Sequence, residues 1–277
     1  MYLFDKFYDS GKFGSGILLL ETFVVSVLGI VSGFVLFPSE ASLIGIFLIA
    51  FAQARTVEVL LNRNRDEIWN KVYPSQVANF RLAWSLFVLF MAILVTYCVA
   101  TLVVPEAKLL DLFERQIGDY GGHSITEVAF DDLVGILTNN LIVLVIAFIF
   151  ALVYRHGGML LVLAWNASVW GVVFPYIART APDQSAGGPF VYFLKSFVSI
   201  IPHLFLEAVA YILIAMAGVF LSKAIQKYEV GSKQFNQVMG AVFRIVVLAT
   251  VVLVVASVVE ALVAPALIGL LFDVPAG

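Results

Sequence analysis

Four ionisable residues lie inside long apolar stretches of this sequence: Glu21, His203, Glu207 and Glu260. Three uncharged polar residues lie in similar surroundings: Asn139, Asn140 and Asn166. An ionisable side chain at the centre of a bilayer costs roughly 2.5–3.5 kcal/mol, so each is a candidate functional group. Carboxyl, imidazole and amide groups can share hydrogen bonds between helices, relay protons or bind a metal ion.

The spacing of His203 and Glu207 places them one helical turn apart on the same face. Three interpretations are open. The polar groups are structural contacts between helices; or Glu207 and Glu260 carry protons or ions in a transporter; or His203, Glu207 and Glu260 are the ligands of a metal-dependent intramembrane hydrolase. A second nearby histidine, which such a hydrolase usually has, is missing here, so we expect no metal and no other cofactor.

Ser196 and Ser199 lie close enough to His203 in sequence that a serine–histidine nucleophile stays open. Serines at helical spacing are more often contacts between helices, and we therefore name no catalytic residue.

Composition defines the class of protein. The chain has 277 residues, of which 62% are hydrophobic and 13% charged, and its mean hydropathy is +1.02. A soluble domain is about half apolar and about a quarter charged. These values, with a net charge of -3, exclude a soluble enzyme and a nucleic-acid-binding protein. The single cysteine, Cys98, excludes an intrachain disulfide.

Apolar stretches long enough to cross about 30 Å of hydrocarbon recur along the chain and predict an all-α polytopic membrane protein. We expect a bundle of about seven transmembrane helices. The first contains Glu21 and is too long for a signal peptide, so we expect it to be retained. The second is the weakest, because Arg55 and Glu58 follow its apolar part. The predicted spans are Ile17–Phe37, Ser42–Leu61, Leu82–Val104, Leu133–Tyr154, Met159–Ile177, His203–Ser222 and Val242–Val263.

The distribution of basic residues predicts an N-terminus in the cytoplasm and a C-terminus outside. Twelve of the sixteen Lys and Arg residues then lie in cytoplasmic segments and four outside. The cytoplasmic residues are Lys6, Lys12, Arg55, Arg63, Arg65, Lys71, Arg81, Arg155, Lys223, Lys227, Lys233 and Arg244. The outer residues are Lys108, Arg115, Arg179 and Lys195.

This topology brings several polar residues to similar depths in the outer half of the membrane. Glu207 lies about 6 Å deeper than His203, and Asn140 and Glu260 lie at comparable depths on other helices. Asn166 falls near mid-bilayer. We predict that Asn140, Asn166, His203, Glu207 and Glu260 form one hydrogen-bonded network in the core, with Asn139 beside it.

Three segments between the spans carry distinct patterns. Asn62–Phe80 is predicted to be a polar cytoplasmic connector. Ala107–Ile117 is amphipathic and predicts a helix on the outer face, lying in the membrane interface or packing against the bundle. Phe190–Ile201 is predicted to be a short re-entrant or interfacial segment closed by Pro202.

A further pattern lies in the first span. Gly29 and Gly33 form a G-x-x-x-G motif, which is typical of a helix-pairing face. The pairing would join two copies in a homo-oligomer or two helices of one protomer.

The C-terminal half resembles the stage II sporulation protein M family over about residues 130–266. The resemblance consists of five elements in order, none of them specific alone. They are the Asn139–Asn140 pair, the WNASVWG segment with Asn166 and Gly171, the Pro202–His203 element with Glu207, the later Gly218, and Glu260 in VVEAL. Ala167 and Leu204 stand where the family has glycine.

The resemblance implies two parts: an N-terminal extension, 1–125, with three transmembrane helices and the outer amphipathic segment, and a four-helix domain, 126–277. It also implies a non-catalytic scaffold or membrane-remodelling component of a prokaryotic cell membrane. Its partners would be membrane lipids and other proteins. In endospore-forming bacteria, such proteins resemble the membrane member of a complex with peptidoglycan-degrading enzymes that drives engulfment.

Overall fold

The computed structural model describes residues 14–118, 133–180 and 187–272, and all regular structure in these ranges is helical. The expected basic residues Lys6 and Lys12, and the expected domain boundary at 125–126, lie outside the described residues. The helices are α2 (Ser15–Leu36), α3 (Ala41–Trp69), α4 (Ser75–Val103), α5 (Leu109–Ile117), α7 (Leu133–Thr180), α8 (Pro189–Lys227) and α9 (Lys233–Phe272), with short 3₁₀ turns at Pro38–Glu40 and Glu106–Lys108.

The predicted all-α class is confirmed for the described residues. Six of the described helices, all but α5, are long and apolar enough to cross a membrane. Each predicted span lies within or almost within one of them, and most of the helices extend further than the apolar stretch alone. This extension is expected, because a helix continues past the apolar stretch wherever propensity and packing allow it.

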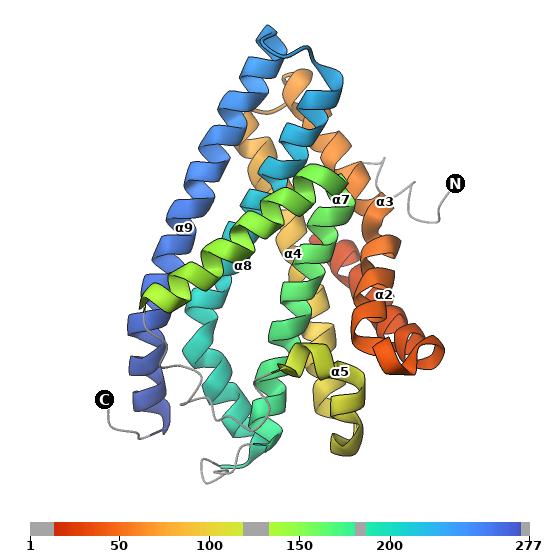
Figure 1. Cartoon of the computed structure of the whole chain (residues 1–277), viewed down its shortest axis with the longest axis vertical. Coiled ribbons are helices and arrows are strands. Elements are labelled where there is room, and N and C mark those ends of the chain that lie inside the picture. Colours follow the sequence, from red (N-terminus) through yellow and green to blue (C-terminus); the bar gives the residue numbers. More distant parts are fainter. Residues whose placement is uncertain (1–13, 119–132, 181–186, 273–277) are drawn as a thin grey trace.

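The helix α7 contains both the fourth and the fifth predicted spans and bends sharply between them. Arg155 has a positive φ of 55° inside the helix. A Cβ on Gly158 would overlap the Phe150 carbonyl group, so only glycine lets the two halves approach this closely. Figure 1 shows the two halves meeting at an acute angle near the α7 label.

The prediction of a separate segment ending at Pro202 is wrong. Pro189–Lys227 is one continuous helix that passes through Pro202. A proline removes one backbone hydrogen bond, and neighbouring helices can compensate for that loss in an apolar bundle.

The segment expected to be a polar connector, Asn62–Phe80, is mostly helical. Here α3 continues to Trp69 and α4 begins at Ser75, so only a short turn separates them. Ion pairs within this segment, such as Arg63 with Glu67 at 3.0 Å, stabilise helix in a polar sequence.

The amphipathic helix α5 packs against the bundle. Its predicted apolar stripe, Leu109, Phe113 and Ile117, is buried. The Ser42 hydroxyl of α3 donates to the Leu112 carbonyl at 2.8 Å, and the Phe113 ring meets Tyr97 of α4 edge-on. Of the two placements expected for this segment, packing against the bundle is therefore observed.

The turns at α3–α4 and α8–α9 lie at one end of the molecule, at the top of Figure 1, while α5 lies at the other.

The side chain of Arg179, from the second half of α7, donates to the Thr101 and Val104 carbonyls, both at 2.6 Å. It thus satisfies the free carbonyl groups at the C-terminus of α4.

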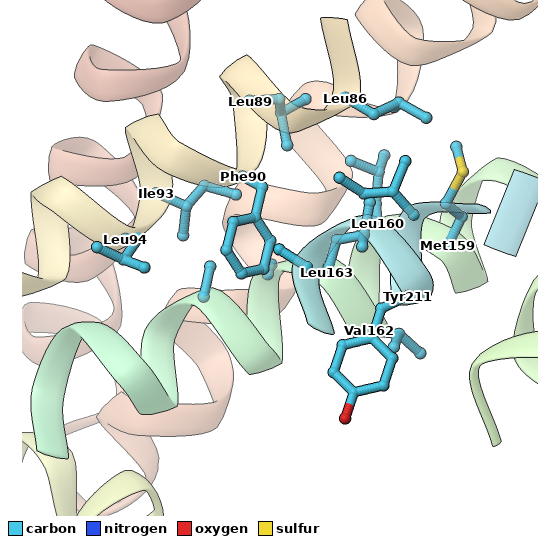
Figure 2. Close-up of a cluster of buried hydrophobic side chains, with 14 of the residues drawn as sticks. Leu86, Leu89, Phe90, Ile93, Leu94, Met159, Leu160, Val162, Leu163 and Tyr211 are labelled. Carbon is cyan, nitrogen blue, oxygen red and sulfur yellow. The ribbon is translucent and has the colours of Figure 1, made fainter. Parts of the chain in front are cut away.

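The centre of the core joins α4, the second half of α7, and α8. Figure 2 shows Leu89, Phe90 and Ile93 of α4 beside Leu160 and Leu163 of α7, all of them buried. Tyr211 of α8 extends from the same cluster and is 2% exposed.

Glycines mark the closest helix crossings. A Cβ on Gly33 of α2 would lie 2.9 Å from the Ala41 carbonyl oxygen and from the Gly45 nitrogen of α3. A Cβ on Gly29 would lie 2.5 Å from Ile49 of α3. The G-x-x-x-G motif therefore joins α2 to α3 within one protomer.

Two more glycines act in the same way. A Cβ on Gly171 of α7 would lie 2.6 Å from the Leu94 carbonyl oxygen of α4, and one on Gly218 of α8 would lie 2.7 Å from the Phe148 carbonyl oxygen of α7. Both obstacles are backbone atoms, which cannot rotate away as a flexible side chain can.

We predict that Gly33→Val lowers the stability of the purified protein in detergent. The added methyl groups must push α2 away from α3, and overpacking of this kind costs about 1–3 kcal/mol. The matched control is Gly16→Val, in the same helix, because no atom lies within 4 Å of a Cβ at Gly16. Thermal unfolding followed by intrinsic fluorescence should show a lower midpoint for Gly33→Val alone; equal midpoints would contradict the close crossing.

Candidate functional site

The buried amide of Asn140 lies at the centre of a polar cluster between α7, α8 and α9. Its nitrogen donates to Glu207 Oε1 at 3.0 Å and approaches Glu260 Oε2 at 3.5 Å, the outer limit of a hydrogen bond. The Tyr211 hydroxyl donates to Asn140 Oδ1 at 3.1 Å. One amide therefore uses both its donor and its acceptor groups to join three helices.

These hydrogen bonds matter for stability because the groups that form them are buried. Asn140 is 6% exposed and Glu207 is 5% exposed. A buried polar group without a partner costs about 1–3 kcal/mol, and more if it is charged. The Asn140 amide brings the carboxyl groups of Glu207 and Glu260 to the same place, so each of the three groups depends on the other two.

His203 lies one turn from Glu207 on α8 and is 5% exposed. Within the described ranges, its Nδ1 atom has no hydrogen-bond partner, and the same holds for the hydroxyl groups of Ser196 and Ser257. Ser199 donates instead to the Lys195 carbonyl of its own helix, at 2.8 Å. The polar face of α8 thus continues beyond the Asn140 cluster.

The other two predicted site residues lie apart from this cluster. Asn139 is exposed. Asn166 donates to the Val162 carbonyl, one turn earlier in its own helix, at 2.8 Å. The structure therefore brings Asn140, Glu207 and Glu260 together, whereas the hydrogen bond of Asn166 is local.

The described residues contain no group of three His, Cys, Asp or Glu side chains that could hold a metal ion. Sequence reasoning missed Tyr211, although its position one turn beyond Glu207 on the same face of α8 was a usable signal. It also missed a polar contact between α2 and α3, in which the Thr56 hydroxyl donates to Glu21 Oε1 at 2.8 Å.

These features define a class: a multi-pass helical membrane protein whose C-terminal helices are joined by buried polar side chains. The family model for stage II sporulation protein M matches residues 84–265, which is more than half of the chain. The chain therefore belongs to the stage II sporulation protein M family. Neither curated proteins nor solved structures yield a match to it.

The matched region begins within α4 and so includes most of α4, all of α5, α7 and α8, and most of α9. Several of the elements that carry the family resemblance fall at contacts between helices. Gly171 and Gly218 are at close crossings, and Asn140, Glu207 and Glu260 form the polar cluster. The two departures, Ala167 and Leu204, are both buried.

We predict that Asn140→Leu destabilises the protein by about 1–3 kcal/mol or more, because it leaves Glu207 and Tyr211 short of a buried partner. Asn139→Leu is the matched control, since the neighbouring residue is exposed and the change in side chain is identical. Thermal unfolding in the same detergent compares the two. Equal midpoints for both variants would show that the Asn140 contacts contribute nothing to the fold.

Proposed function

We propose that this protein is a non-catalytic scaffold in the plasma membrane of a prokaryotic cell, where it recruits partner proteins. The observation that carries the proposal is the hydrogen bonding of Asn140 with Glu207, Glu260 and Tyr211. These buried polar groups serve to join α7, α8 and α9, as a stable frame for partners requires. Family membership agrees with this role.

The proposed topology has seven membrane crossings, with the N-terminus in the cytoplasm and the C-terminus outside. The bend of α7 at Arg155 supports two crossings by this helix. Basic residues such as Arg65, Lys71, Lys223 and Lys227 gather around the α3–α4 and α8–α9 turns, which supports a cytoplasmic location for that end.

We propose α5 as the main docking element on the outer side. Its apolar stripe is covered by the bundle, so the helix is held in a fixed position. Its other face is exposed and consists of Leu110, Asp111, Glu114 and Arg115. A fixed, charged helical face is suited to another protein and poorly suited to hydrocarbon.

The topology predicts which engineered cysteines a membrane-impermeant maleimide reaches in intact cells. In a Cys98→Ala background, Glu106→Cys should be labelled from outside, whereas Val230→Cys should be labelled only after permeabilisation. Both positions are exposed, and Val230 is 80% exposed. Labelling of Val230→Cys in intact cells would mean that α7 crosses the membrane once or that the orientation is reversed.

The scaffold proposal predicts that reversing charges on α5 releases partners without unfolding the protein. Photocrosslinkers at Leu110 should capture partner proteins in the native membrane, and Asp111→Lys with Glu114→Lys should abolish this capture at an unchanged melting temperature. A crosslinker at Phe51, which is 83% exposed on α3, is the control for random membrane neighbours. Identical products from both crosslinker positions would contradict docking at α5.

A proton- or cation-coupled permease is the second candidate. It is favoured by the polar face of α8, where the buried polar atoms of His203 and Ser196 have no partner in the described part of the chain. In proteoliposomes under a pH gradient, a permease predicts a flux that Glu207→Gln abolishes and Asn139→Leu leaves unchanged. Flux equal to that of empty liposomes would favour the scaffold.

A further inference from the structure

A large basic cavity lies at the end of the bundle that carries the α3–α4 and α8–α9 turns, at the top of Figure 1. Its volume is about 820 Å³, and it is formed by the last turns of α3 and α8 and the first turns of α4 and α9. The cavity lining shares no residue with the Asn140 cluster.

The charges around this cavity are strongly unbalanced. Its lining contains five basic residues and one acidic residue, Glu58, in a chain whose net charge is -3. The five basic residues are Arg65, Lys71, Lys223, Lys227 and Arg244. These cations come from α3, α8, α9 and the α3–α4 turn. They repel one another, so a site that gathers them is stabilised by an anion between them.

Internal partners neutralise only part of this charge. Arg65 is paired with Asp66 at 2.9 Å. Glu58 is paired with Arg55, a residue outside the lining, at 3.0 Å. Lys223 donates to the neutral Asn62 side chain at 3.4 Å, and Lys227 lies over the Tyr228 ring. Among the described residues, Lys223, Lys227 and Arg244 make no ion pair.

The rest of the lining is amphipathic. Amide side chains, among them Asn62 and Gln237, add hydrogen-bond donors beside the cations. On the side toward the bundle the wall is apolar and includes Leu61, Phe220 and Val238. The rings of Trp69 and Tyr228 lie 6.0 Å apart between α3 and the end of α8, as aromatic residues do at a membrane surface.

We propose that this cavity binds a phosphate group, carried either by the headgroup of an anionic phospholipid or by a small soluble phosphate compound. Cations and amide donors hold the phosphate oxygens, and the apolar wall accommodates glycerol and acyl carbons, which favours the lipid source. Basic pockets between helix ends on the cytoplasmic side are suited to anionic headgroups. This site is independent of the proposed scaffold function and of docking at α5.

The experiment uses the full chain in nanodiscs of phosphatidylcholine. Cardiolipin or phosphatidylglycerol is added in one arm, and glycerol phosphate or inorganic phosphate in the other. Ligand retention by native mass spectrometry and the melting temperature are measured in both. We expect anionic lipid to be retained preferentially over phosphatidylcholine and to raise the melting temperature.

The test variant is Lys227→Gln with Arg244→Gln, because both side chains are exposed and their loss leaves the core intact. Each removed cation should lower the affinity for anionic lipid about fivefold, so retention should fall about 25-fold in the double variant. The matched control is Lys108→Gln with Arg115→Gln, an equally exposed pair at the opposite end. If the Gln double variant melts at a lower temperature than the wild type, the charge-conserving variant Lys227→Arg with Arg244→Lys replaces it. This variant should retain anionic lipid as the wild type does.

Each outcome decides the proposal. Loss of lipid retention in the test variant alone supports a headgroup site. A response to soluble phosphate in phosphatidylcholine nanodiscs, lost in the same variant, supports the phosphate site with a soluble source. No preference for anionic lipid and no response to soluble phosphate, or equal losses in test and control variants, would overturn it. Whether this proposal is supported or overturned, the outcome does not change the interpretation of the crosslinking test at α5.

Discussion

Helices in a bilayer receive little help from the hydrophobic effect, because lipid chains are as apolar as the side chains that would be buried. Close packing and hydrogen bonds between helices must therefore hold the bundle together. In this protein, Gly33 allows α2 to reach α3, Gly171 allows α7 to reach α4, and Gly218 allows α8 to reach α7. The Asn140 amide then joins α7 to α8 and α9. The remaining contacts depend on these few close approaches.

The same constraint explains where polar atoms lie along the bundle. In the core, a polar group needs a protein partner, and Asn140, Glu207 and Tyr211 provide one another with such partners. At a helix end, an arginine can replace water, as Arg179 does when it donates to the last carbonyl groups of α4. At the end with the α3–α4 and α8–α9 turns, cations gather around a cavity instead, for which we propose an external anion as the partner.

Several elements shared with the stage II sporulation protein M family coincide with contacts that build the bundle. Gly171 and Gly218 contact backbone atoms of neighbouring helices, and Glu207 and Glu260 meet at Asn140. A set of buried polar residues that resembles a catalytic or transport site in the sequence can therefore consist of contacts between helices. This agrees with the proposed scaffold, in which the frame is rigid and the partner surfaces lie at its ends. The match from residue 84 also includes most of α4 and all of α5, the helix proposed for docking.

The sequence alone determined the class and the position of the apolar helical stretches, because an apolar stretch in a bilayer must satisfy its own backbone and so forms a helix. It also determined the buried stripe of α5, through the period of Leu109, Phe113 and Ile117. Only the tertiary structure decided that the helix passes through Pro202, and that Asn140 meets Glu207 and Glu260 while Asn166 bonds within its own helix. Depth along a helix follows from counting residues, but the direction of a side chain depends on which neighbouring helix packs against it and at what angle.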